Sequence, residues 1–187
     1  MDSKIDIITK ASKGDKIALI DLIKLEQQNI YTTLFYLKKD ENGLEDIMQD
    51  VLIKLSKKIT DLKNPNYFKT WLNQIVVNSY YDYLRKVKKA PDSISLNRFE
   101  DNIELDVADN TFNPQDTILY TELDNIIKRS IENLPNHYKI PLALREIQGL
   151  SYDEISNITK TSIGTIKSRI ARARALIKDD ITRYSKE

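Results

Sequence analysis

The sequence is 187 residues long, which suits one or two domains, and 41% of its residues are hydrophobic, which suffices for globular cores. The formal net charge of +1 hides an asymmetry, because residues 1–90 carry +4, residues 91–117 carry −6 and residues 118–187 carry +3. The lack of cysteine and the single histidine, His137, exclude disulfides, thiolate metal sites and a histidine-based catalytic triad. We therefore expect a protein of the reducing cytoplasm that is not an enzyme and uses no metal and no cofactor.

The first ninety residues are predicted to be helical, because the chain has few glycines and prolines and many Lys, Glu, Ile and Leu. The opening residues lack the long apolar core of a signal peptide, and no apolar run approaches membrane length, so no membrane insertion is expected. Asp15 is suited to cap a long helix whose apolar positions continue to Leu37. A turn at Asn42-Gly43 precedes a second helix, which starts at Leu44.

The stretch from Phe68 to Lys89 follows a break that has Pro65 at a suitable first-turn position. Trp71 shares an apolar face with Leu72 and is therefore expected in the core rather than on DNA. The rest of the stretch interleaves tyrosines with lysines and amides. Single-stranded DNA binding uses this combination, because bases stack on aromatic rings while cations meet the phosphates. Tyrosines half-buried in a core give the same pattern, so both interpretations stay open here.

Residues 91–113 show no lasting helical or strand period and are rich in Asp, Glu and Asn. A stretch of this length without a period of its own marks a domain boundary rather than a loop within one compact domain. We therefore predict an irregular acidic linker between a first domain at 1–90 and a second domain at 114–187.

Two helices are predicted at the start of the second domain. Asn113-Pro114 supplies a cap and a first-turn proline, which together signal a helix start. A break near Pro135 separates that helix from the next, which should continue to Gln148. Pro141 lies inside this next helix, where it removes one backbone hydrogen bond and crowds a carbonyl, so we predict a kink there.

A short helix, a tight turn and a longer basic helix are predicted from residue 151 onward. Ser151 and Glu154 form a capping box that starts the short helix. After a break at residues 160–162, apolar residues recur from Ile163 at three- and four-residue steps, so they share one side of a second helix. That helix has no acid before Asp179, whereas surface helices usually alternate signs to form ion pairs. The pattern is typical of a helix-turn-helix, whose second helix lies in the DNA major groove. The plainer alternative is a surface helix that happens to be basic.

Three segments, in this order, resemble the extracytoplasmic-function (ECF) group of bacterial RNA polymerase sigma factors, of the sigma-70 class. The family's polymerase-docking segment is similar to GLEDIMQDVLIKLSKKI, and its promoter-melting segment is similar to FKTWLNQIVVNSYYDYLRK. The family's region 4 is similar to LPNHYKIPLALREIQGLSYDEISNITKTSIGTIKSRIARAR. The resemblance implies an all-α fold of two small helical domains. These are a region 2 bundle at 1–90 and a region 4 helix-turn-helix at 114–187, joined by the irregular acidic linker.

The resemblance also implies roles for individual residues. Region 4 would read the minus-thirty-five promoter element with Arg145, Ser162, Gly164, Thr165, Lys167, Ser168 and Arg172. Region 2 would recognise and melt the minus-ten element with Lys63, Asn64, Tyr67, Asn78, Tyr81 and Arg85. Asn78 would line a pocket for a flipped base, together with the loop at residues 60–66. Some relatives carry an aromatic where Leu62 stands here, and Tyr67 is the candidate substitute. Core polymerase would meet Asp46, Gln49, Asp50 and Lys54, which without the resemblance suggest only a solvated helix face.

The resemblance implies three partners. They are core RNA polymerase, contacted at its clamp helices and its flap, promoter DNA, and an anti-sigma factor of the kind that holds many relatives inactive. The acidic linker resembles the family's connector through the polymerase channels, and its composition is equally that of plain disorder in the isolated chain. The predicted function is therefore promoter-specific initiation of transcription as a sigma factor. The alternative is a stand-alone helix-turn-helix repressor, whose N-terminal half would dimerise or sense a ligand and which would bind a symmetric site unaided.

Overall fold

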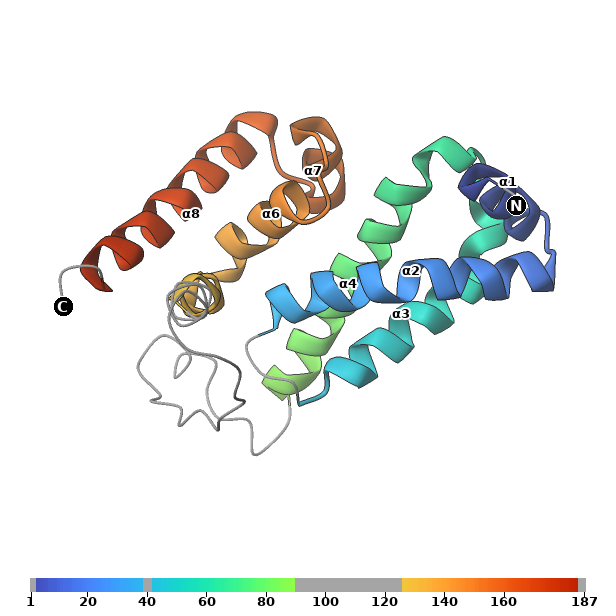
Figure 1. Cartoon of the computed structure of the whole chain (residues 1–187), viewed down its shortest axis with the longest axis horizontal. Coiled ribbons are helices and arrows are strands. Elements are labelled where there is room, and N and C mark those ends of the chain that lie inside the picture. Colours follow the sequence, from blue (N-terminus) through green and yellow to red (C-terminus); the bar gives the residue numbers. More distant parts are fainter. Residues whose placement is uncertain (1–2, 39–41, 90–125, 185–187) are drawn as a thin grey trace, which may run out of the picture.

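The computed structural model describes residues 3–38, 42–89 and 126–184. Within these ranges all regular secondary structure is helical, which confirms the predicted all-α fold. Figure 1 shows two groups of helices side by side along the long axis of the molecule, α1 to α4 at one end and α6 to α8 at the other. The linker predicted at 91–113 and the helix start predicted at Asn113 lie outside the described residues.

The N-terminal bundle contains four helices and two short 3-10 turns. They are α1 (Lys4–Ser12), α2 (Lys16–Leu37), α3 (Leu44–Lys58), η1 (Ile59–Asp61), η2 (Pro65–Tyr67) and α4 (Phe68–Lys89). Asp15 caps α2 as predicted, since its carboxylate accepts hydrogen bonds from the backbone N–H groups of Ile17 and Ala18. Helix α1, which was not predicted from the sequence, begins with a capping box between Ser3 and Asp6.

Apolar side chains from α2, α3 and α4 form the core of the N-terminal bundle. The fully buried ones include Leu22, Leu34, Leu37, Val51, Leu55 and Val77. They recur at helical spacing within each helix, so each helix turns one apolar face toward the others. Helix α1 packs along α2 and adds Ile8 and Ala11 to this core. The polar faces of α3 and α4 are thereby held at fixed positions on the outside of one rigid unit.

Gly43 makes the turn into α3, as the Asn42-Gly43 pair predicts. Its φ of +77° lies in the left-handed region, which glycine adopts without strain. The site is also crowded, because a Cβ on Gly43 would lie 3.1 Å from Cε2 of Tyr83 on α4. Glycine therefore allows the start of α3 to approach the end of α4 closely.

The C-terminal bundle contains a helical segment at residues 126–133 followed by three helices. These are α6 (Asn136–Glu146), α7 (Tyr152–Thr159) and α8 (Ile163–Tyr184). The capping box that starts α7 is confirmed: Oγ of Ser151 accepts from the N–H of Glu154 at 3.2 Å, and Oε2 of Glu154 accepts from the N–H of Ser151 at 2.8 Å. Helix α6 continues through Pro141, and a kink at that residue stays a prediction.

The apolar stripe predicted for α8 faces the interior of the C-terminal bundle. Ile166, Ile170 and Ala173 are buried against Ile155 of α7, while Ile177, further along the stripe, is half-buried. This packing fixes α8 across α7 and turns the basic side of α8 outward. None of the helices in the described ranges is both long and apolar enough to cross a bilayer.

The two bundles pack directly on each other, with α2 against α6 and α4 against α7 (Figure 1). Polar side chains make much of this contact. Thr70 and Gln74 of α4 hydrogen-bond to α7, and Gln148, just after α6, hydrogen-bonds to α2. Helix α4 and the helix-turn-helix formed by α7 and α8 are therefore neighbours in this structure.

Candidate nucleic-acid interface

The turn between α7 and α8 presents the start of α8 to solvent. Lys160 adopts a left-handed conformation with φ of 53°, and Oγ of Ser156 donates a 2.6 Å hydrogen bond to the carbonyl of Thr161. Oγ of Ser162 then accepts from the backbone N–H of Thr165 at 3.3 Å, which caps the first turn of α8. A tight, internally bonded turn of this kind fixes the angle between α7 and α8, as a helix-turn-helix requires.

Most of the predicted minus-thirty-five residues on α8 are exposed to solvent. Ser162, Gly164, Lys167, Ser168 and Arg172 are exposed, and Thr165 is half-buried with its hydroxyl 2.8 Å from that of Ser162. Gly164 has open space around its Cα, so its backbone can approach a phosphate closely. Five of these six residues are thus accessible on the basic helix α8.

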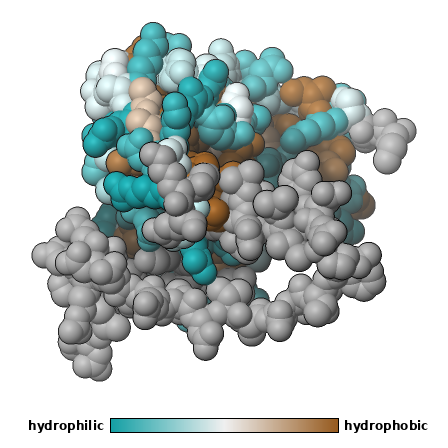
Figure 2. Space-filling view, turned by 60° about the vertical axis from the view of Figure 1, so that its left-hand side comes forward, coloured by the Kyte–Doolittle hydropathy of each residue, from teal (hydrophilic) through white to brown (hydrophobic). Residues whose placement is uncertain are grey.

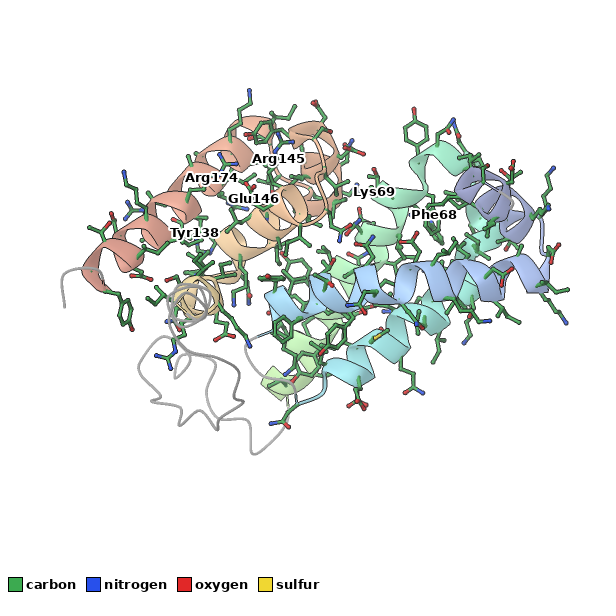
Figure 3. All side chains as sticks on the ribbon, in the orientation of Figure 1. Phe68, Lys69, Tyr138, Arg145, Glu146 and Arg174 are labelled. Carbon is green, nitrogen blue, oxygen red and sulfur yellow. The ribbon has the colours of Figure 1, made fainter. Side chains whose placement is uncertain are left out.

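Arg145 differs from the other predicted minus-thirty-five residues, because it already has partners within the protein. Its Nη1 donates a 2.8 Å hydrogen bond to the carbonyl of Leu150, and its guanidinium lies 4.9 Å from the centre of the Tyr152 ring. Lys167 lies 5.7 Å from the same ring. Arg145, labelled in Figure 3, therefore holds the connection between α6 and α7. The ring of Tyr152 lies close to two cations, Arg145 and Lys167.

Arg174 is the one strongly paired cation of the α8 basic run among the described residues. It hydrogen-bonds to Oε1 of Glu146 on α6, and this bond raises the pKa of the guanidinium. Figure 3 shows Arg174 and Glu146 next to each other between the two helices. The pair joins α8 to α6 at an exposed position, so Arg174 helps to set the orientation of α8.

The predicted minus-ten loop corresponds to η1, η2 and the residues between them. Lys63, Asn64 and Tyr67 are exposed, and Tyr67 presents 66% of its surface to solvent. Oδ1 of Asn64 accepts from the N–H of Asn66 at 3.0 Å and so caps η2. Leu62 is only 8% exposed and packs in the core, so the position that is aromatic in some relatives does not face a pocket here. Tyr67 is the exposed aromatic next to this loop.

The face of α4 carries the remaining minus-ten candidates. Asn78 is exposed, and its Oδ1 accepts a 3.2 Å hydrogen bond from Nε2 of Gln74. Tyr81 is half-buried, and burial raises the pKa of its hydroxyl while the nearby Arg169 of α8 opposes that rise. Arg85 pairs with Asp82 one turn earlier at 3.2 Å. Asn78 and Arg85 are thus exposed at the surface, whereas Tyr81 is half-buried.

Two aromatics of α4 belong to the core. Trp71 is half-buried with its ring centre 6.0 Å from that of Phe68, in agreement with the core position expected for it. Tyr80 is 3% exposed, and its hydroxyl donates to the carbonyl of Leu37 at 2.7 Å. Of the two interpretations left open for the tyrosines, the one that places them in the core therefore holds for Tyr80.

The four predicted polymerase contacts divide into two pairs. Asp46 and Gln49 are exposed on the first turns of α3. Asp50 and Lys54 are half-buried and bound to each other at 2.8 Å, and Lys54 also reaches Asp82 of α4 at 3.0 Å. Burial opposes the charge of Lys54, but the bonds from both carboxylates outweigh it and raise its pKa. Lys54 therefore joins α3 to α4, while Asp46 and Gln49 face outward.

An apolar groove of about 510 Å³ lies between α6 and α8 and includes Tyr36 of α2. Apolar side chains line most of it, among them Ile131, Leu142, Ile177 and Ile181. Figure 2 shows apolar surface among polar side chains at this end of the molecule. In the described part of the chain, no cluster of three His, Asp or Glu side chains could hold a metal ion.

Comparison with known proteins identifies the family. Residues 22–90 match the model of sigma-70 region 2, and residues 124–177 match the model of sigma-70 region 4. The chain is 32% identical over 178 residues to an ECF RNA polymerase sigma-E factor of Haemophilus influenzae, a match that covers 94% of this chain and 93% of the relative. The chain belongs to the ECF sigma factors. An Escherichia coli K12 sigma-E factor is also 32% identical, across 94% of this chain and 92% of its own length.

Two solved structures share the fold. The sigma factor RpoE from Bartonella quintana, solved in complex with the anti-sigma factor NepR, has a TM-score of 0.67 at 22% identity, covering 86% of this chain and 94% of the other. CnrH, solved in complex with the cytosolic domain of CnrY, has a TM-score of 0.64 at 17% identity, covering 97% and 99%. The ECF sigma factor described here thus has the two helical domains that the sequence predicts, and it directs promoter-specific initiation of transcription.

The residues that join the two domains were not predicted from the sequence. They are Asn29, Thr33, Thr70, Asn73, Gln74 and Gln148, all polar and all on helices or helix ends. Polar residues at such positions normally signal a solvated face. Their role becomes visible only in the folded chain, where the amides of Asn73 and Gln148 are buried, at 4% and 3% exposure.

Proposed function

We propose that this ECF sigma factor reads the minus-thirty-five element with the outward face of α8. The supporting observation is the set of exposed polar and basic side chains on α8, which includes Lys167 and Arg172. Lysine and arginine bind phosphates or guanine edges in the major groove, and only the contacts to bases carry sequence choice. Arg145 would contribute indirectly, because its hydrogen bond to the carbonyl of Leu150 keeps α7 and α8 in position.

We further propose that η2 and α4 recognise and open the minus-ten element. Asn78 would hydrogen-bond the edge of a flipped base, and Tyr67 offers an exposed ring for stacking. Stacking is worth ~1–3 kcal/mol per base, which is enough to offset the few kcal/mol needed to unstack one. Lys63, Asn64 and Arg85 would take phosphates and polar base atoms, and Tyr81 would join them once Arg169 has moved away.

The outward acids and amides of α3 support a docking site for core RNA polymerase. Asp46 and Gln49 present an acidic, amide-rich helix edge that suits basic side chains on the clamp helices. Asp50 and Lys54 would support this edge by tying α3 to α4 rather than by direct contact alone. The C-terminal bundle would engage the flap of the polymerase.

Regulation by an anti-sigma factor fits the fold, because the similar RpoE structure contains the anti-sigma factor NepR. The sigma factor itself would act in the cytoplasm and carry out no chemistry, because RNA synthesis belongs to the polymerase. The domain boundaries proposed are 1–90 and 114–187, with 91–113 as the acidic connector.

A gel shift with and without core polymerase tests the proposal against the repressor alternative. A sigma factor of this kind should bind a two-element promoter only when core enzyme is present. A stand-alone repressor would bind a symmetric operator tightly by itself, and that result would overturn the proposal. The family matches do not favour the repressor.

A further inference from the structure

Four residues of alternating charge form a chain from α3 to α4. Nζ of Lys54 lies 2.8 Å from Oδ2 of Asp50 on α3 and 3.0 Å from Oδ2 of Asp82 on α4. The other oxygen of Asp82, Oδ1, lies 3.2 Å from Nη1 of Arg85. Asp50, Lys54, Asp82 and Arg85 are called the charge chain below. Its two carboxylates and two cations balance, so the loss of one member leaves a net charge beside α4.

The ammonium of Lys54 is fully engaged within the protein. A lysine ammonium has three N–H donors, and besides meeting the two carboxylates Nζ donates to Oγ of Ser79 at 3.0 Å. Ser79 is only 2% exposed. Burial opposes the charge of Asp50, but the bonds from Lys54 and Ser79 outweigh it and lower the pKa of the Asp50 carboxyl. A polymerase contact at Lys54 would therefore have to displace one of these three partners.

Asp82 lies on the face of α4 that is proposed to meet the minus-ten strand. Asn78, Asp82 and Arg85 are four and three residues apart in a continuous helix, so they share one face. The side chain of Asp82 is 41% exposed. A carboxylate at this position repels the phosphates of an approaching strand unless a cation neutralises it. The minus-ten face thus contains an acid that requires a counter-charge.

Two cations share the carboxylate of Asp82, one on each oxygen. The Lys54 side chain comes from α3 and is 28% exposed, whereas the Arg85 side chain on α4 is 70% exposed. Since Lys54 occupies Oδ2, a pair in which Arg85 binds both oxygens of Asp82 is disfavoured. The guanidinium has five N–H donors, so those not directed at Asp82 can bind a phosphate. Without Lys54, both oxygens would be open to Arg85, and the guanidinium would be drawn away from the strand.

We propose that Lys54 is a positioning residue for the minus-ten strand: it neutralises Asp82 and thereby keeps the guanidinium of Arg85 available to a DNA phosphate. This inference rests on the proposed role of α4 in minus-ten recognition. It gives Lys54 a role on the DNA side of the domain, beyond joining α3 to α4. Because Lys54 acts through Asp82, its effect on DNA binding should vanish when residue 82 carries no charge. A residue that only stabilises the bundle would not show this dependence.

Binding of holoenzyme to a short single-stranded minus-ten oligonucleotide, measured by fluorescence anisotropy at several salt concentrations, tests this dependence. Lys54→Met should weaken binding about 5-fold and reduce the slope of affinity against salt by about 0.7, as for one lost phosphate contact on a single strand. Adding Asp82→Asn to Lys54→Met should restore both, because Arg85 is then released from the carboxylate. Adding Asp21→Asn, an exposed acid of α2, should restore neither. Lys54→Arg keeps the cation and should bind like the unmutated chain.

Arg85→Ala separates failure of this inference from failure of the proposed function. In the otherwise unmutated chain it should reduce the salt slope by the same amount as Lys54→Met. Added to Lys54→Met it should reduce the slope no further, because Arg85 is already withdrawn from the strand. Separate, additive effects of the two substitutions would overturn the inference and leave the proposed function intact. An Arg85→Ala holoenzyme that binds the oligonucleotide with unchanged affinity and slope would instead remove Arg85 from the minus-ten site and overturn both.

A pull-down with core polymerase and circular dichroism distinguish the proposed role from docking and from folding. Lys54→Met should retain its helical signal and bind core polymerase like the unmutated chain. Lys54→Gln, which keeps a hydrogen-bonding group without the charge, should show the same loss of DNA binding and the same rescue, and it replaces Lys54→Met if that variant loses helical content. Weakened association with core polymerase, or a loss of oligonucleotide binding that Asp82→Asn leaves unchanged in folded protein, would overturn the inference.

Discussion

Lys54 of α3 reaches across to α4 and places its Nζ 3.0 Å from Oδ2 of Asp82 and 3.0 Å from Oγ of Ser79. Its other partner, Asp50, lies one turn earlier on α3 at 2.8 Å. The same ammonium thus joins the helix proposed to dock on polymerase to the helix proposed to open DNA. A residue assigned to a partner surface by resemblance has, in the folded chain, an internal structural role.

Replacing this ammonium should loosen the contact between α3 and α4. Lys54→Met removes three hydrogen-bonded contacts at a half-buried site, and we expect it to lower the free energy of unfolding by about 1 kcal/mol. Urea denaturation followed by circular dichroism measures the change. Lys57→Met, an exposed lysine of the same helix, is the control and should change stability little. Equal stability of both variants would show that the Lys54 contacts contribute nothing measurable.

Two cations of α8 should account for part of the salt dependence of promoter binding. Lys167→Ala and Arg172→Ala should each weaken holoenzyme binding and reduce the slope of affinity against salt by about one counterion. Arg183→Ala, exposed near the end of the same helix, should leave the slope unchanged. Affinity titrations at several salt concentrations provide the measurement. An unaltered slope in both variants, with full transcription from the cognate promoter, would remove these residues from the interface.

Asn78 should matter for opening rather than for duplex binding. Asn78→Ala removes the amide proposed to bind a flipped base, so the holoenzyme should still bind duplex promoter but should melt the minus-ten element less. Permanganate footprinting detects unpaired thymines and therefore reports melting directly. Gln28→Ala, an exposed amide on α2, serves as the matched control. A parallel loss of duplex binding and melting would argue against a base pocket at Asn78.

Acid should weaken the contact between α4 and α7. The hydrogen bond from Thr70 is the main cause that lowers the pKa of Glu154, with bonds from Ser151 and the charge of Lys69 acting in the same direction. Figure 3 shows Lys69 on the side of α4 near α7. A carboxylate with a lowered pKa stabilises the contact above its ordinary value of about 4.3, and this stabilisation is lost as pH falls through the lowered value.

The measurement is interdomain fluorescence transfer against pH, with circular dichroism recorded in parallel. Transfer should fall as the pH drops below about 4.3 while the helices persist. Thr70→Val should flatten this dependence, because it removes the bond that perturbs Glu154, and the exposed Asp153→Asn should not. Acid-independent transfer in the unmutated chain would mean that Glu154 does not contribute to closure.

Local signals in the sequence predicted most of the helices. The cap at Asp15, the turn at Gly43 and the capping box at Ser151 each act within a few residues, so the sequence alone reveals them. Helix α1 was not predicted because it is short and because its capping box uses Asp6 in place of the usual Glu or Gln.

The candidate site was predicted less completely, because its residues depend on distant partners. The exposed positions on α8 follow from helical spacing alone. By contrast, Leu62 is buried, Lys54 is paired with α4, and Gln148 bonds to residues more than a hundred positions away. Contacts of this kind leave no period in the sequence, and a polar residue on a helix is read as solvated unless its partner is known.

Run-off transcription with purified bacterial core polymerase tests the central claim most directly. With a library of two-element promoters, we predict discrete transcripts that require both the core enzyme and this chain, and that weaken with Lys167→Ala and Asn78→Ala. Failure of the chain to associate with core enzyme, together with tight binding to a symmetric operator on its own, would contradict the account.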